Sequence, residues 1–303
     1  MLSMGFDTIT FTILNGLYYA FSLFLISLGL NLLYGILRIL NVAHGGFYAA
    51  GAFFTWYLMK NAHDAGLPLS VLFVCVFVGA LLVGVLGMIL EPLLYKRLYR
   101  KREEYSLLAT FGLMLVLDDV LRLVFGSQPL SAGYLYAGIG SMQIFGRPFP
   151  IYNFVIYAFA IGVALSLWLL LFKTNLGRIT RATAQDTEMS SALGVNTSLH
   201  YTKLFTLAIA IAGLGGAIYL PATSAYPGMG FEAIVLSFVV MVVGGLGSLK
   251  GSLIGAVIIG LVRAFGISLF PEFELAAVFA ILVIVLVFRP RGLCGRKFSR
   301  EEK

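Results

Sequence analysis

The sequence predicts an all-α, polytopic transmembrane helical bundle of eight to nine hydrophobic segments. Of the 303 residues, 60% are hydrophobic and only 12% are charged, and the mean hydropathy is +0.96. A soluble domain carries roughly a quarter of its residues as charges. The charges here gather between long apolar runs, and these runs lack the alternating pattern of a lipid-facing β-barrel. Lipid is therefore the expected solvent of the runs.

The basic residues concentrate in three stretches, 96–104, 173–203 and 289–303. The net charge of +7 could indicate nucleic acid, but such a binder displays its Lys and Arg on a folded surface with few apolar runs. Loops rich in Lys and Arg are typical of the cytoplasmic side of a membrane protein. We therefore expect all three stretches, including the C-terminal tail, in the cytoplasm, and we expect no nucleic acid partner.

The first expected span, residues 11–34, contains no charge. At about 1.5 Å per residue it reaches roughly 36 Å, enough to cross a hydrocarbon core of about 30 Å. The same test predicts five further spans: 42–59, 69–90, 105–125, 151–172 and 204–222.

Residues 233–262 are long enough for one span or two, because the only charge among them is Lys250 in the glycine-rich turn 244–251. A last run, 275–288, precedes the basic tail. If the 173–203 loop and the tail share one side, an even number of crossings separates them, which favours nine spans and an external N-terminus. The 126–150 segment, rich in proline and glycine, is expected to form a compact external loop. No soluble domain is expected, so 1–303 reads as one transmembrane domain.

Small residues recur at intervals of four in two of the expected spans. Such spacing lets neighbouring helices approach closely, and the alternative is a glycine-lined part of a translocation path. The residues expected to pack helices are Ala208, Ala212, Gly216, Gly251 and Gly255. The turn that contains Gly245 and Gly247 lacks the order of a phosphate-binding loop, so these two glycines are candidates for the pathway.

Asp118, Asp119 and Arg122 lie inside an apolar segment, where each charge needs a partner or water. A local ion pair between Asp118 and Arg122, four residues apart on one helix face, is one interpretation. A proton or solute site is the other. No second carboxylate cluster, metal-ligand set or catalytic motif accompanies them, so no catalytic residue, metal or cofactor is predicted.

Asn41 and His44 stand at the start of an expected span. They are candidates for the solute pathway, because polar side chains are costly there unless they face protein or water. The alternative is that Asn41 caps the helix and His44 makes an interhelical hydrogen bond.

A short amphipathic stretch, 184–194, lies in the basic loop 173–203, with Met189, Ala192 and Leu193 at helical spacing and Gly194 as a stop. We expect a helix at the cytoplasmic face that docks a partner. The alternative is a solvated connector.

The chain resembles the permease subunits of branched-chain amino acid ABC importers, the LivH type, over essentially its whole length. The motifs that carry the resemblance are Asn31–Gly35 running into Asn41–Gly45, Gly177-Arg178 with Arg181–Asp186 and Ala192–Asn196, Phe205 with Ala208, Ala212–Gly216 and Pro227–Gly230, Gly244–Ser248 with Gly251 and Gly255, and Phe288–Leu293.

This resemblance implies an ABC importer permease fold in a bacterial inner membrane. It also implies a second homologous permease subunit, two cytoplasmic ATP-binding subunits and an external solute-binding protein as partners. The 184–194 helix then looks like the coupling helix, with Asp186, Glu188, Ala192, Leu193 and Gly194 as contact residues. Glu188 and Gly194 are similar to the Glu and Gly of the EAA loop of importer permeases, whereas Met189 and Ser190 replace its two alanines.

Three alternatives stay open at this point. Permeases for urea or short amides have similar sequences. An ion-coupled secondary transporter would use Asp118, Asp119 and Arg122. An intramembrane enzyme would need motifs that the sequence lacks. Because the chain also contains no nucleotide-binding motif, we expect the energy for uphill transport to come from a partner.

Overall fold

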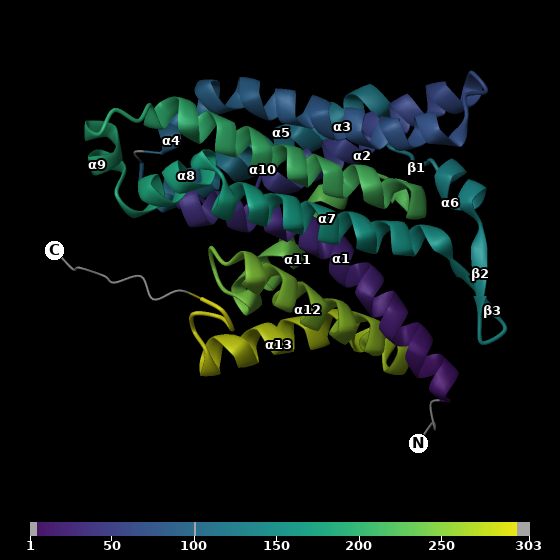
Figure 1. The fold of residues 1–303 in the computed structure, drawn as a ribbon. Helices are drawn as coiled ribbons and strands as arrows, with labels where there is room; N and C mark the ends of the chain where they lie inside the picture. Colours follow the sequence, from purple (N-terminus) through teal and green to yellow (C-terminus); the bar gives the residue numbers. More distant parts are fainter. Residues whose placement is uncertain (1–4, 100, 296–303) are drawn as a thin grey trace.

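The computed structural model describes residues 5–99 and 101–295, and it confirms the all-α class (Figure 1). The α-helices are α1 (Phe6–Leu37), α2 (His44–Asp64), α3 (Leu69–Leu90), α4 (Lys96–Leu98), α5 (Glu103–Phe125), α6 (Tyr134–Ile139), α7 (Ile151–Lys173), α8 (Asn175–Gln185), α9 (Thr187–Ala192), α10 (Thr197–Tyr219), α11 (Met229–Gly244), α12 (Leu249–Leu269) and α13 (Glu274–Phe288). The π-turn η1 (Glu91–Tyr95) extends α3 where Pro92 lacks the N–H that an α-helical bond needs. Two 3₁₀ turns, η2 (Leu220–Ala222) and η3 (Pro271–Phe273), follow α10 and precede α13.

Six helical segments within the described residues are long and apolar enough to cross a membrane. They are α1, α3 continued through α4, α7, α10 with η2, α12, and η3 with α13. The predicted number of eight to nine spans is therefore too high by this measure. The expected spans at 42–59, 105–125 and the first part of 233–262 do form helices, namely α2, α5 and α11. These three helices are not both long enough and apolar enough to count as membrane spans.

The three helices fall short for identifiable reasons. In α5 every membrane-length stretch contains Asp118, Asp119 and at least one further charge. In α2 the glycines and the polar end that includes Lys60 lower the hydropathy. Finally, α11 has 16 residues, which at about 1.5 Å per residue is too short to cross a bilayer of about 30 Å.

Helix α1 is the centre of the bundle (Figure 1). It packs against α12 and α11 on one side and against α10 and α7 on the other, while α10 packs in turn against α2 and α3. By contrast, α13 packs mainly on α12 and α11 and leaves most of its apolar side chains exposed. Apolar exposure of this kind suits a lipid environment, because lipid tails solvate such side chains.

The 233–262 stretch is two helices, which decides a question that the sequence left open. Gly245 and Gly247 have φ angles of 115° and 73°, where residues with a Cβ are strained, and they end α11. Ser248 then caps α12 by accepting a hydrogen bond from the Gly251 N–H at 3.0 Å. The chain after α13 returns to this turn, where the N–H groups of Leu293 and Cys294 donate to the carbonyls of Val243 and Gly244.

The 126–150 segment forms a small ordered unit around α6. Strand β1 (Leu130–Ser131) pairs antiparallel with β4 (Ser224–Ala225), and β2 (Ser141–Ile144) forms a hairpin with β3 (Arg147–Pro150). In Figure 1 this unit lies at the right end of the bundle, whereas α4, α8 and α9 lie at the left end. The expected basic loops 96–104 and 173–203 therefore share one end, and the membrane side that this end faces stays a prediction.

Candidate functional site

Helix α9 stands at the left end of the bundle in Figure 1 and carries the residues expected to contact a partner. Asp186, Glu188, Ala192, Leu193 and Gly194 are all exposed, and Leu193 has 78% of its surface free. An apolar side chain this exposed in a polar loop has no packing role within the chain. These residues therefore form an accessible surface at the end of the bundle.

The expected single helix over 184–194 is wrong. Ala184 and Gln185 belong to α8, and the chain breaks at Asp186, whose side chain accepts a hydrogen bond from the Met189 N–H at 2.8 Å and so caps α9. The expected stop at Gly194 is observed, since its φ is +88° and the Val195 N–H reaches back to the Ser190 carbonyl at 3.1 Å.

Hydrogen bonds tie α9 and its neighbours to the bundle. The hydroxyls of Thr187 and Tyr201 lie 2.8 Å apart, and Thr202 donates to the buried Glu91 carboxylate of the π-turn at 2.7 Å. Thr180 of α8 and His200 of α10 are joined at 3.1 Å. These bonds connect α9 to α10, and they connect α10 to α8 and to the π-turn at the end of α3.

A polar cleft lies beside α9. It has about 890 Å³ of empty space, part of it open at the surface. Its lining comes from the end of α1, the α4–α5 connection, α8, α9 and α10, and includes Arg38, Lys101, Glu103, Gln185 and Thr187.

Asn41 and His44 are both completely buried, so they do not face an open pathway in this structure. The expected capping by the Asn41 side chain is wrong, because its amide oxygen accepts from the Tyr95 hydroxyl at 2.9 Å and no side chain caps α2. The expected interhelical bond of His44 is present, since its Nε2 lies 3.1 Å from the Ile26 carbonyl of α1. A carbonyl only accepts, so Nε2 carries the hydrogen.

Gly245 and Gly247 lie in the α11–α12 turn, which α1 holds in place. The buried Asn31 accepts from the Gly247 N–H at 2.8 Å and donates to the Ser252 hydroxyl at 2.6 Å. Gly247 also lies against Gly35, so that a Cβ on Gly35 would lie 3.2 Å from the Gly247 Cα, a tight contact. His44 and Gly247 contact α1 at different places, whereas Asn41 bonds to Tyr95 and Gly245 lies against Cys294 and Gly295. The structure therefore does not bring the four pathway candidates together into one site.

The glycines and alanines expected to pack helices lie at close helix contacts. A Cβ on Gly216 of α10 would meet the Tyr48 carbonyl of α2 at 1.9 Å, and a Cβ on Gly251 or Gly255 would meet an α11 carbonyl oxygen at 2.4 Å. The backbone oxygen of Ala208 lies against Gly29 of α1, and Ala212 is fully buried.

Asp118 and Arg122 do not form the expected ion pair. The Asp118 carboxylate accepts from the Gly228 N–H at 2.8 Å, just before α11, and the Arg122 Nε donates to the Ser127 hydroxyl at 3.0 Å. Asp119 is exposed. Asp118 thus fixes the start of α11 against α5.

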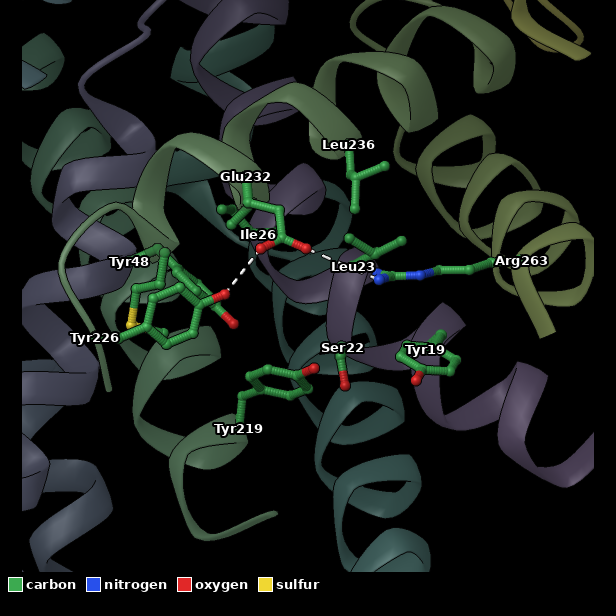
Figure 2. A pocket seen from close by; sticks show the side chains of 12 residues that line it. Tyr19, Ser22, Leu23, Ile26, Tyr48, Tyr219, Tyr226, Glu232, Leu236 and Arg263 are labelled. Carbon is green, nitrogen blue, oxygen red and sulfur yellow. Dashed lines mark hydrogen bonds and ion pairs between the residues drawn. The ribbon is translucent and has the colours of Figure 1, made fainter. Parts of the chain in front are cut away.

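A pocket that the sequence did not reveal lies where five helices meet (Figure 2). It holds about 500 Å³ of empty space, part of it open. Its lining residues come from α1, α2, α10, α11 with its preceding loop, and α12: Tyr19, Ser22, Leu23, Ile26, Tyr48, Tyr219, Tyr226, Met229, Glu232, Ala233, Leu236 and Arg263.

The pocket contains charges of both signs. Arg263 of α12 contacts Glu274 through Nε, lies 3.8 Å from the Glu232 carboxylate and stacks over the Tyr19 ring at 4.7 Å. The Tyr226 hydroxyl donates to the second oxygen of Glu232 at 2.8 Å (Figure 2). Partial burial, and after it the bonded Glu232, raises the pKa of Tyr226 to about 12, so the hydroxyl stays a donor at neutral pH.

Ile26 connects this pocket to one predicted residue, because its side chain lines the pocket and its carbonyl meets His44. Arg263 and Glu232 are charges inside or beside apolar helices, a signal that marks functional positions in membrane proteins. A charge within an apolar segment is also what singled out Asp118 in the sequence, and the same criterion could have identified Glu232 and Arg263. Among the described residues, no three His, Cys, Asp or Glu side chains are grouped to hold a metal ion.

Membrane-length helices that pack around a pocket containing Glu232 and Arg263 define a multi-spanning membrane protein. The model of the family described as "Branched-chain amino acid transport system / permease component" matches residues 12–288, and the chain belongs to this family. The family is one of transport permeases rather than of enzymes.

Curated relatives match the chain over nearly its full length. The high-affinity branched-chain amino acid transport system permease protein LivH of Escherichia coli (strain K12) is 28% identical over 93% of this chain and 94% of its own. BraD of Pseudomonas aeruginosa, a permease protein of the same description, is 27% identical over 94% of this chain and 95% of its own. LivM of Escherichia coli (strain K12) is 24% identical over 89% of this chain and 67% of its own.

Proposed function

We propose that the chain is the membrane-spanning permease subunit of an ABC importer that carries branched-chain amino acids into the cell. The observation that carries this proposal is the family match over residues 12–288, together with relatives of near-equal length whose names state branched-chain amino acid transport. The chain itself supplies the path through the membrane. The membrane in this proposal is the inner membrane of a bacterial cell, because the three relatives compared above are bacterial.

The proposed assembly contains a second homologous permease subunit, two cytoplasmic ATP-binding subunits and an external solute-binding protein. The similarity of the chain to both LivH and LivM, two permease proteins of one named system in one organism, supports a second permease. The absence of a nucleotide-binding motif from the sequence supports ATP hydrolysis on partners.

The basic loops 96–104 and 173–203 and the tail 289–303 face the cytoplasm in this proposal, in line with the positive-inside rule. Helix α9 then contacts an ATP-binding subunit through Glu188, Ala192 and Leu193. Closure of the ATP-binding subunits moves α9, and the hydrogen bonds from Thr187 to Tyr201 and from Thr202 to Glu91 pass that movement to α10 and α3. The spans then open alternately to the two sides.

The experiment is copurification of the ATP-binding subunits with variants of the affinity-tagged permease. Glu188→Lys and Leu193→Asp change exposed α9 side chains, so both should insert normally and lose most of the copurifying ATPase. The charge-matched control is Glu104→Lys, since Glu104 is exposed at the same end of the bundle but lies outside α9. Unchanged ATPase recovery and unchanged uptake in both α9 variants would contradict the coupling role.

A further inference from the structure

The pocket in Figure 2 contains one carboxylate and one guanidinium whose ends point toward each other and are joined by a dashed line. Glu232 reaches into it from α11, and Arg263 reaches into it from α12. The two groups are 3.8 Å apart at their closest, which is longer than a direct hydrogen bond. They face each other, yet they leave hydrogen-bonding capacity unused.

The charges do not cancel. Two carboxylates, Glu232 and Glu274, share the one guanidinium, and Glu274 holds its Nε. A guanidinium has five N–H donors, so the terminal nitrogens of Arg263 keep donors free for another acceptor. Within the described part of the chain, the Glu232 carboxylate is contacted by the Tyr226 hydroxyl and, at 3.8 Å, by Arg263, and 53% of its side-chain surface is exposed. Glu232 can therefore accept a further cationic donor.

The remaining wall is apolar and shaped by aliphatic side chains. Leu23 and Ile26 contribute from α1, and Leu236 contributes from α11 one turn beyond Glu232. Ser22, Leu23 and Ile26 of α1 are themselves buried, with no more than 8% of the surface of each exposed, so each presents a small part of its side chain to the pocket. An apolar wall next to two charges with unused hydrogen-bonding capacity matches a small molecule with one aliphatic end and one zwitterionic end.

We propose that this pocket binds a free α-amino acid with a branched aliphatic side chain during its passage. The ammonium group contacts Glu232, the carboxylate contacts the free donors of Arg263, and the side chain lies against Leu23, Ile26 and Leu236. The inference rests on the proposed function, since it names the residues that receive the substrate within the permease. Glu274 and Tyr19 act as positioning residues, because they hold the guanidinium.

The charge arrangement discriminates between ligands. A monocarboxylate would pair with Arg263 but would stand near the Glu232 carboxylate without an ammonium to compensate. An amine would pair with Glu232 but would face the guanidinium. A neutral amide such as urea would gain no ionic contact, because Glu232 and Arg263 would keep the partners that they already have. Only a zwitterion pairs with both.

The test is protection of a pocket cysteine in the assembled transporter in proteoliposomes. The variant is Ala233→Cys, with the native Cys75 and Cys294 replaced by alanine, and Ser22→Cys is a second position if the first assembles poorly. Leucine should slow maleimide labelling several-fold. Labelling should not be slowed by 4-methylpentanoate, which lacks the amino group, or by 3-methylbutylamine, which lacks the carboxylate. Asn61→Cys, exposed on α2 and outside the pocket, is the control whose labelling should not respond.

Second variants test the two charges. Glu232→Gln or Arg263→Lys, added to the cysteine variant, should abolish the protection by leucine while ATPase copurification persists. Glu272→Gln, an exposed glutamate that does not line the pocket, should leave the protection intact.

The inference is overturned if leucine gives no protection at either cysteine while the same vesicles take up leucine with ATP. It is also overturned if the two singly charged analogues protect as well as leucine does, or if Glu232→Gln and Arg263→Lys keep the protection. Loss of ATPase copurification and of ATP-driven uptake in the unmodified chain would instead contradict the proposed function, so the two failures are distinguishable.

Discussion

At the residue scale, Asn31 shows why a polar side chain is found at the centre of an apolar bundle. Its exposed surface is 1%, yet its oxygen accepts from the Gly247 N–H and its nitrogen donates to the Ser252 hydroxyl and to the Ser248 carbonyl. A buried polar group without partners costs about 1–3 kcal/mol. Asn31 therefore stabilises the α11–α12 turn instead of weakening α1.

Substitution of Asn31 by alanine should lower the free energy of unfolding by about 1–3 kcal/mol, because the partly buried Gly247 N–H loses its acceptor and the Ser252 hydroxyl loses a donor. The measurement is the midpoint of thermal unfolding in detergent. Asn61→Ala is the matched control, since Asn61 is exposed and bonds only to the Tyr57 carbonyl of its own helix. Equal shifts in the two variants would show that the Asn31 contacts do not hold the turn.

Asn31 belongs to a motif that the chain shares with the permease family, but the sequence does not explain why an asparagine stands at this position. The reason lies in residues more than 200 positions away, at Gly247 and Ser252. In the same way, the partner of Asp118 is a backbone N–H at Gly228 rather than the Arg122 one turn along its helix. Local spacing finds neighbours on one helix, and it does not find partners on another.

At the element scale, small residues decide how close two helices come. Gly216 brings α10 against α2, and the four-residue spacing that includes Ala208 and Ala212 predicted a close-packing face from sequence alone. The positions at which the chain breaks between α8 and α9 and between α11 and α12 were harder to predict from the sequence. Asp186 separates α8 from α9 through a cap, and the α11–α12 turn depends on glycines with positive φ and on the returning tail.

Two glycine variants should differ sharply. In Gly216→Ala the new Cβ would lie 1.9 Å from the Tyr48 carbonyl, so α2 and α10 must separate, and we expect a loss of several kcal/mol or failure to assemble. In Gly194→Ala nothing lies within 4 Å of the Cβ, so the cost is the left-handed backbone alone, about 1–2 kcal/mol. Monodisperse yield in detergent and thermal stability compare the two. A Gly216→Ala protein as stable as Gly194→Ala would contradict the observed contact.

At the scale of the whole molecule, the composition was enough to predict a membrane bundle, because lipid as solvent leaves few alternatives. The number of spans could not be predicted in the same way, since α2, α5 and α11 are helices that lack the length or the hydropathy of a span. The pocket was out of reach for another reason. Its walls come from five helices, and the meeting of Glu232 with Arg263 depends on how α11 and α12 pack against α1.

The arrangement of the two ends predicts which loops are accessible from outside the cell. Single cysteines at Gln143, in the β2–β3 hairpin, and at Ser191, in α9, lie toward opposite ends of the bundle. A membrane-impermeant maleimide should label the Gln143→Cys variant in intact cells, and it should label Ser191→Cys only after permeabilisation. Labelling in the reverse order would place α9 outside and would contradict its contact with a cytoplasmic ATPase.

The most direct measurement of the central claim is uptake of radiolabelled leucine by proteoliposomes that contain the chain with its second permease, the ATP-binding subunits and the binding protein. The account predicts accumulation that requires ATP and the ATP-binding subunits and persists when a proton ionophore dissipates the proton gradient. Accumulation by the chain alone without nucleotide, or its abolition by the ionophore while ATP is maintained, would contradict the account.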